Sequence, residues 1–237
     1  MSKGNLYLIP VPLADCDPGN VAPANLKARV AGLTIFVVEN AKTARHWLKW
    51  YGHPSELRQL TILELKESDG RDEVAAYLAP LLEGKNVGLM SEAGCPGVAD
   101  PGANLVREAH RAQIRVVPQV GPSSLLLALM ASGLNGQRFA FHGYLPVDRN
   151  ERFKVITALE QRSRRDNETQ IFIETPYRNG ALFQALIDTC VSRTLLCIAT
   201  DVTGDTEMIA TRTVGEWRKQ IPNLEKRPTV FLLLGNS

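Results

Sequence analysis

The sequence contains few cysteines, and their spacing argues against two common kinds of site. Cys16, Cys95, Cys190 and Cys197 are the only cysteines among 237 residues, and no pair is spaced as C-x-x-C. This spacing predicts neither a zinc site nor a redox-active pair. We therefore expect reduced thiols, no bound metal and a cytoplasmic location.

Long apolar runs and targeting signals are also lacking. The longest apolar run, Leu125–Ala131, is too short to cross a bilayer, so we expect no membrane span. The N-terminus begins with a strand-like pattern rather than the basic and apolar regions of a secretory signal. Two common nucleotide-binding motifs, G-x-G-x-x-G and G-x-x-x-x-G-K-[ST], do not occur.

Neither basic nor acidic residues are in large excess. The chain carries 27 Lys and Arg against 25 Asp and Glu, for a formal net charge of +2. This balance neither demands nor excludes a nucleic-acid partner. Apolar residues make up 44% of the sequence, enough for the core of one large or two modest domains.

Strand-like apolar runs alternate with amphipathic helical runs, which is typical of an α/β protein with parallel or mixed sheets. We expect strands near residues 6–9, 33–38, 87–90, 114–118, 138–142, 170–174, 195–200, 207–213 and 228–234. Helices are expected near 40–51, 71–83, 102–112, 123–132, 149–161, 179–189 and 214–220. The second half is richer in strands. This change predicts two α/β domains, residues 1–120 and 121–237, joined by a linker within 119–137.

A turn rich in glycine and proline follows the apolar run 87–90. It reads S-E-A-G-C-P-G-V-A-D-P-G from Ser91 to Gly102, and we call it the signature loop. A helical pattern follows it from Leu105 to Ala112. In α/β proteins a strand end, bare backbone and a helix N-terminus converge at such a turn, which makes it a usual ligand site. A tight connection without a ligand is the structural alternative.

A second loop has similar chemistry. The segment Val116–Ser124 reads V-V-P-Q-V-G-P-S-S; its residues 119–124 are called the proline loop below. A helical run to Ser132 follows, and Gly133 stands where a C-cap glycine is expected. If the two preceding strands are neighbours in a parallel sheet, both loops face the same crevice.

Five elements of the chain, in order, resemble motifs of the tetrapyrrole methylase superfamily, which are S-adenosylmethionine (SAM) dependent methyltransferases. The signature loop resembles S-[DE]-A-G-x-P-G-x-x-D-P-G, and the proline loop resembles P-G-P-S-[AS]. The other three elements are L-Y-L-I-P-V-P-L from Leu6, F-A-F-H-G-Y-L-P from Phe139 and I-F-I-E-T-P-Y-R from Ile171. Within the superfamily, the chain is most similar to the branch of ribosomal RNA small-subunit methyltransferase I, which methylates ribose 2'-hydroxyls.

The resemblance implies a fold, a cofactor and a set of binding residues. The expected fold has two α/β domains that enclose SAM in a cleft between them, and the expected assembly is a homodimer. The cofactor-binding residues implied by the motifs are Pro10, Cys95, Pro96, Gly97, Val98, Gly121, Ser123, Ser124, Thr175, Ile209, Ala210 and Thr211. Cys95 stands where the branch usually has Thr. Ser123 is also a natural N-cap of the helix that follows it.

Methyl transfer to a ribose hydroxyl benefits from a group that accepts the hydroxyl proton. The candidate catalytic residues are Glu39, Glu92 and Asp100, and Glu174 in the E-T-P element is a further carboxylate. Both Asp100 and Glu92 also have structural alternatives to a catalytic role. Asp100 stands directly before Pro101, where the N-cap of a helix is often found, and the Glu92 carboxylate can accept hydrogen bonds from loop amides. A nucleophilic role for Cys95 is not favoured, because no histidine lies near it in the sequence.

On the acceptor side the chain departs from the branch, which typically reads E-D-T-R-x-[TS]-x-x-L-L where this chain has E-N-A-K-T-A-R-H-W-L from Glu39. Residues 65–71 also lack the histidines usual there. We predict substrate binding by Lys42, Arg45 and Arg178, although lysine lacks the bidentate fork of arginine. We interpret the chain as a diverged paralogue. Its acceptor is ribosomal RNA or a small tetrapyrrole-like metabolite, or the protein is a catalytically silent SAM binder.

A basic segment is the last candidate feature. Six basic side chains lie between residues 149 and 165, and they are Arg149, Arg152, Lys154, Arg162, Arg164 and Arg165. Such a patch can follow RNA phosphates. We favour the alternative, a solvated helix face.

Overall fold

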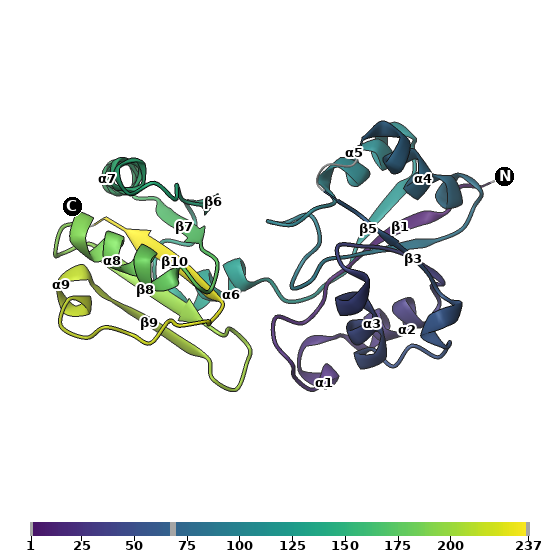
Figure 1. The fold of residues 1–237 in the computed structure, drawn as a ribbon, viewed down its shortest axis with the longest axis horizontal. Helices are drawn as coiled ribbons and strands as arrows, with labels where there is room; N and C mark the ends of the chain where they lie inside the picture. Colours follow the sequence, from purple (N-terminus) through teal and green to yellow (C-terminus); the bar gives the residue numbers. More distant parts are fainter. Residues whose placement is uncertain (1, 67–69, 236–237) are drawn as a thin grey trace. The chain divides into compact units, whose positions relative to one another are not determined.

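The computed structural model describes residues 2–66 and 70–235, and its contacts divide the chain into two compact units. Unit 1 runs from Met1 to Ser123 and unit 2 from Ser124 to Ser237. Each unit is built on one five-stranded sheet with helices packed on it (Figure 1). The α/β fold class predicted from the alternating pattern is confirmed, with one parallel and one mixed sheet.

Unit 1 holds a parallel sheet in the order β3-β2-β4-β1-β5. Its strands are β1 (Asn5–Ile9), β2 (Ile35–Val38), β3 (Thr61–Glu64), β4 (Val87–Met90) and β5 (Arg115–Pro118). Its helices are α1 (Pro18–Val21), α2 (Ala24–Ala31), α3 (Ala41–Trp50), α4 (Arg71–Leu82), α5 (Ala103–Arg111) and the 3₁₀ turn η1 (Leu57–Gln59).

Both faces of this sheet are covered. Every residue of β2 and β4 is buried, as expected for the centre of a parallel sheet flanked by helices. Successive strand residues point to opposite faces, so Leu6 joins one core cluster and Tyr7 joins the other. Burial on both sides fixes the register of the strands and therefore the positions of the loops at their ends.

The helix α3 begins at a residue that departs from the expected family motif. Asn40 is its N-cap, and the Asn40 side chain accepts hydrogen bonds from the backbone amides of Lys42 (2.9 Å) and Thr43 (3.1 Å). Asparagine caps helices as well as aspartate does. The exchange at position 40 therefore preserves the start of α3.

Unit 2 holds a mixed sheet in the order β6-β7-β10-β8-β9, in which β6 and β7 are parallel and the other pairs antiparallel. Its strands are β6 (Phe139–Tyr144), β7 (Thr169–Ile173), β8 (Leu195–Thr200), β9 (Met208–Thr213) and β10 (Thr229–Leu234). Its helices are α6 (Ser124–Ser132), α7 (Arg149–Asp166), α8 (Asn179–Thr189) and α9 (Val214–Trp217).

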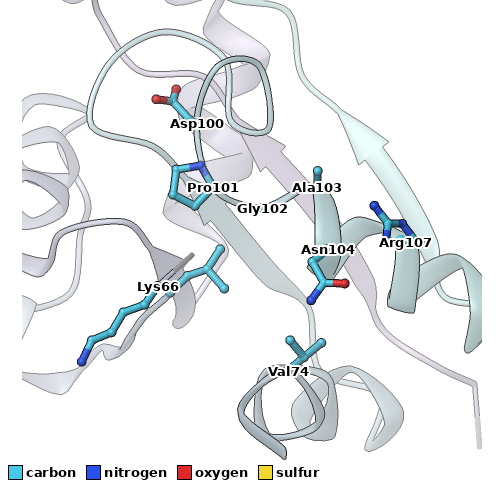
Figure 2. Close-up of a pocket in the computed structure, with 9 residues that line it drawn as sticks. Lys66, Val74, Asp100, Pro101, Gly102, Ala103, Asn104 and Arg107 are labelled. Atoms are coloured by element: carbon cyan, nitrogen blue, oxygen red, sulfur yellow. The ribbon is translucent and has the colours of Figure 1, made fainter. Parts of the chain in front are cut away.

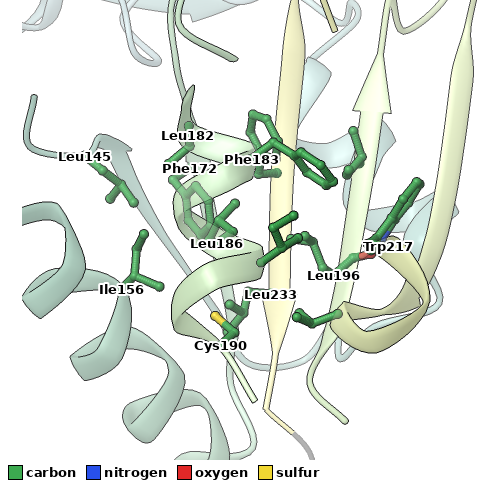
Figure 3. Close-up of a cluster of buried hydrophobic side chains, with 14 of the residues drawn as sticks. Leu145, Ile156, Phe172, Leu182, Phe183, Leu186, Cys190, Leu196, Trp217 and Leu233 are labelled. Atoms are coloured by element: carbon green, nitrogen blue, oxygen red, sulfur yellow. The ribbon is translucent and has the colours of Figure 1, made fainter. Parts of the chain in front are cut away.

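Aromatic side chains organise the core of unit 2 (Figure 3). The rings of Phe172 and Phe231 are stacked across adjacent strands, with centroids 6.1 Å apart. Trp217 is buried, yet its indole nitrogen donates a 2.8 Å hydrogen bond to the Leu196 carbonyl. The large ring is thus buried without an unpaired donor.

Most of the described elements lie where the hydrophobic pattern predicts them, and four were missed: α1, α2, η1 and β3. The helices α1 and α2 cover a segment that shows no clear period, and β3 is only four residues long. The helix α7 runs five residues beyond its predicted end, whereas α9 stops three residues before it. Residues 67–69, within the segment that lacks the family's histidines, lie outside the described residues. Within the described part of the chain, no helix is long and apolar enough to cross a membrane.

Candidate functional site

The signature loop and the proline loop follow two parallel strands of the unit 1 sheet, so they lie at the same edge. The strands β4 and β5 are not direct neighbours, because β1 lies between them. The chain after β1 connects the two loops. Val11 and Gly94 exchange two backbone hydrogen bonds of 2.8 and 3.1 Å, and the Cys95 thiol donates to the Pro122 carbonyl at 3.3 Å.

Two glycines in these loops have different structural roles. A Cβ atom at Gly121 would lie 2.3 Å from the Pro10 Cβ, so only glycine lets the proline loop pack against the end of β1. Gly97 has a φ of 79°, a backbone conformation that favours glycine, and a Cβ there would be in ordinary contact with the Ala103 nitrogen at 4.0 Å. Because Gly97 is exposed, its backbone is accessible to a ligand.

The three predicted catalytic carboxylates come from the ends of β2 and β4 and influence one another. The Glu39 carboxylate accepts a 3.0 Å hydrogen bond from the Glu92 amide. The Glu92 carboxylate accepts one from the Thr43 hydroxyl at 3.1 Å, and its carbonyl accepts one from the Trp47 indole at 2.9 Å. The helix α3 therefore holds the first turn of the signature loop.

Asp100 has the most perturbed carboxyl group of the three. Its pKa is raised from 3.8 to about 7, mainly by burial and also by the negative charges of Glu39 and Glu92, against a lowering hydrogen bond with Ser91. The N-cap interpretation of Asp100 is wrong, because the N-cap of α5 is Gly102, whose φ of 125° suits glycine alone. The Asp100 carboxylate therefore does not cap α5, and its pKa suits proton transfer near neutral pH.

Cys95 is a poor nucleophile in this setting. Its side chain is half-buried, and the pKa of its thiol is raised by burial and by the charge of Asp100. A raised pKa keeps the thiol protonated, and a thiol is far less reactive than a thiolate. Its observed contact is the hydrogen bond to Pro122, which links the two loops.

A pocket of about 440 Å³ adjoins the signature loop (Figure 2). It lies between the residues after β3, the helix α4 and the start of α5, and it includes Asp100. The sequence interpretation missed this pocket, because Lys66, Asn104 and Arg107 are separated along the chain and belong to no motif. The one available signal was their position just after β3 and at the start of α5.

The predicted substrate-binding residues are divided between the units. Lys42 and Arg45 are exposed on α3 of unit 1, while Arg178 lies just before α8 of unit 2. Arg178 donates to the Glu174 carboxylate from two nitrogens, at 3.0 and 2.6 Å. The same Glu174 oxygen accepts the Thr175 amide at 2.7 Å. The pair thus fixes the turn that carries Thr175.

The predicted cofactor residues are divided in the same way. Pro10, the residues Cys95–Val98, Gly121 and Ser123 belong to unit 1, and Ser124 begins α6 of unit 2. Ile209, Ala210 and Thr211 lie on β9 and are half-buried. The Thr211 hydroxyl donates a 2.6 Å hydrogen bond to the Ser132 carbonyl, so it also ties β9 to α6.

Known proteins are similar to this chain in sequence. The chain is 30% identical to ribosomal RNA small subunit methyltransferase I of Escherichia coli O157:H7, over 99% of this chain and 79% of that protein. It is 34% identical to the protein of the same name from Mesorhizobium japonicum, over 88% of this chain and 67% of that one. No family model matches the chain.

Solved structures of two other proteins have the same fold. The methyltransferase CobJ aligns with a TM-score of 0.65 at 19% identity, covering 99% of this chain and 95% of its own. Diphthine synthase aligns with a TM-score of 0.69 at 15% identity, covering 98% and 90%. Among the described residues, no group of histidine, cysteine or acidic side chains is arranged to hold a metal.

The relatives define a SAM-dependent methyltransferase, and the fold is that of the tetrapyrrole methylases. The chain belongs to the family of ribosomal RNA small subunit methyltransferase I.

Proposed function

We propose that this protein transfers the methyl group of SAM to a ribose 2'-hydroxyl of ribosomal RNA. The observation that carries the proposal is the similarity to ribosomal RNA small subunit methyltransferase I along 99% of the chain. The half-buried carboxyl group of Asp100, at the end of the signature loop, supports it chemically.

The loops of unit 1 fit one part of the cofactor. The exposed backbone at Gly97 and Val98 is accessible to a ligand, and the Gly121 contact with Pro10 holds the proline loop against the end of β1. In unit 1, Ser123 supplies a hydroxyl group. SAM brings a methyl group on a positively charged sulfur, which the acceptor oxygen displaces in a single in-line step.

Asp100 accepts the proton in this scheme. Bound SAM would supply the methyl group and take up the electron pair of its carbon–sulfur bond, and the Asp100 carboxylate would take the proton of the 2'-hydroxyl. Burial, together with the charges of Glu39 and Glu92, raises the pKa of Asp100 to about 7, where a carboxylate is a stronger base than at its usual pKa. A single positioned base of this kind typically contributes a rate factor of about 10²–10⁴.

The test is methyl transfer to small-subunit ribosomal RNA from a strain that lacks the modification. Tritium from labelled SAM should enter the RNA and remain in an alkali-resistant dinucleotide, because a methylated 2'-oxygen cannot attack the neighbouring phosphate. Label in mononucleotides would instead show base methylation. The absence of label in RNA, with SAM bound in calorimetry, would contradict the proposal.

A small tetrapyrrole-like acceptor is the second candidate function. The observation that favours it is Lys42, an exposed lysine where the RNA-modifying branch usually has arginine. The same labelled SAM assay with a tetrapyrrole precursor separates the two. Turnover on neither acceptor would favour a catalytically silent SAM-binding protein.

The proposed assembly is a homodimer in the cytoplasm. The helix α6 carries exposed apolar side chains, with Leu126 at 53% and Met130 at 80% exposure, which favour burial against a second copy. An RNA substrate and free cysteines suit a cytoplasmic location. Light scattering of the purified chain, compared with Met130→Lys, tests the dimer; a monomeric wild-type protein would contradict it.

A further inference from the structure

The pocket beside the signature loop combines three kinds of surface. Its floor is apolar, because Leu65 and Val74 are buried there. Lys66, Asn104 and Arg107 are exposed at its rim, and Asp100 lies at one end. Figure 2 shows Asp100 and Val74 at opposite ends, with Lys66 and Arg107 on opposite sides.

The size of the pocket suits a single small organic group. Its volume of about 440 Å³ lies within the range of roughly 300–1,000 Å³ that is typical of ligand pockets. It opens at the carboxyl edge of a parallel sheet, where α/β proteins bind their ligands. An apolar floor accommodates a flat ring, and the rim offers cations and a carboxylate.

One cation at the rim, Arg107, differs from the next arginine on the same helix. Across the part of the chain that the structure describes, the Arg107 side chain makes no ion pair or hydrogen bond, whereas Arg111, one turn further along α5, pairs with Glu108. Lys66 adds a second exposed cation across the pocket. Two cations on opposite sides of one pocket match the two phosphates that flank a nucleotide within an RNA strand.

We propose that this pocket receives the acceptor nucleotide, turned out of its stack, with its ribose toward Asp100 and its flanking phosphates on Lys66 and Arg107. The inference rests on the proposed function and names the place of its substrate. Enzymes that modify nucleotides commonly extrude the target from its neighbours into a pocket. Here the apolar floor replaces the lost stacking, and the ribose hydroxyl faces the carboxylate that takes its proton.

The assignment predicts effects on RNA rather than on the cofactor. Removing one phosphate contact in Lys66→Gln or Arg107→Gln should raise the KM for RNA about tenfold, the equivalent of one charge-assisted hydrogen bond. Each variant should also reduce the slope of log KM against log salt concentration by about one. The rate at saturating RNA and the Kd for SAM should stay within about twofold.

The experiment compares these variants with Arg115→Gln as the matched control. Arg115 is exposed at the amino end of β5, on the opposite edge of the same sheet, so its loss should leave the KM and the salt slope unchanged. Asn104→Trp fills the rim without changing charge and should raise the KM for RNA. Thermal unfolding verifies that every variant folds, and calorimetry measures SAM binding.

The experiment distinguishes the failure of this inference from the failure of the proposed function. If the wild-type protein methylates RNA and Lys66→Gln, Arg107→Gln and Asn104→Trp behave like Arg115→Gln, the pocket is not the acceptor site and only this inference falls. If the wild-type protein transfers no methyl group to RNA, the proposed function falls and takes the inference with it.

Discussion

Acidic side chains that follow strands have different partners in the two units. In unit 2, Glu174 is bound by Arg178 and Asp201 by Arg227, at N–O distances of 2.6 and 2.7 Å. In unit 1, Glu39, Glu92 and Asp100 influence one another, and the pKa of Asp100 is raised to about 7 by burial and by its acidic neighbours. Paired carboxylates stabilise a framework, whereas a destabilised one is available for proton transfer.

Topology explains the difference. All five strands of the unit 1 sheet are parallel, so every loop after a strand lies at one edge, and side chains from distant segments meet there. The antiparallel strands of unit 2 deliver their ends to both edges. The comparison predicts that substitutions in unit 1 mainly change rates, while those in unit 2 mainly change stability.

The largest effect is expected for Asp100→Asn. Amide cannot accept the hydroxyl proton, so kcat should fall by about 10²–10⁴, while the Kd for SAM stays close to that of the wild-type protein. Single-turnover methyl transfer with calorimetry of SAM binding measures both. An unchanged kcat would remove Asp100 from catalysis and weaken the contrast between the units.

The next largest effect is expected for Arg178→Gln in unit 2. The Glu174 side chain is 1% exposed and would lose its cation, whereas Arg178 itself is 40% exposed, which softens the loss. We expect the free energy of unfolding to fall by about 2–3 kcal/mol, below the full cost of breaking a buried pair. Urea unfolding measures it, with Arg165→Gln, from the exposed pair with Asp166, as a control that should change nothing.

A smaller effect is expected for Gly121→Ala. The new Cβ would lie 2.3 Å from the Pro10 Cβ and 2.5 Å from its Cγ, so the proline loop must move. Overpacking of this kind costs about 1–3 kcal/mol, and the displaced loop should also weaken SAM binding. Gly136→Ala is the matched control, because a Cβ there meets no atom within 4 Å. Equal SAM affinity in the two variants would contradict a binding role for the proline loop.

The smallest expected effect is the contribution of Asp100 to the pH dependence of the free energy of unfolding. The folded pKa of Asp100, about 7, lies above its ordinary value of 3.8, so the folded state holds a proton that the unfolded state has released. Wild-type stability should therefore fall as pH rises from about 4 to about 7, by an amount on the order of 1 kcal/mol for this half-buried group. Asp100→Asn lacks this loss, so it should gain on the wild-type protein as pH rises. Urea unfolding at pH 5 and pH 8 measures the difference, and a gain at lower pH would contradict the assignment.

The local hydrophobic pattern of the sequence was sufficient to predict most of the helices and strands. The apolar runs of β1, β4 and β10 and the amphipathic face of α3 are strong periodic signals, and the structure has them at the predicted places. In α1 and α2 the 3.6-residue period extends over too few residues to be recognised. In β3 the exposure runs from exposed through half-buried to exposed, so no alternation marks it as a strand.

The site was less predictable than the fold, because it depends on strand order. The sequence places two glycine- and proline-rich loops after apolar runs, but nothing local states that β1 separates β4 from β5. The N-cap interpretation of Asp100 failed for a related reason: the turn continues to Gly102, whose positive φ starts α5 two residues later. The pocket around Lys66 and Arg107 depends on the packing of three segments and has no motif.

The pH dependence of single-turnover methyl transfer tests the central claim most directly. With saturating SAM and RNA, the wild-type rate should rise with pH through a midpoint near 7 and then level off, since only the ionised Asp100 accepts the proton. Asp100→Asn should be slow and lack this rise. A wild-type rate that is flat between pH 5.5 and 9, or a midpoint that persists in Asp100→Asn, would contradict the account.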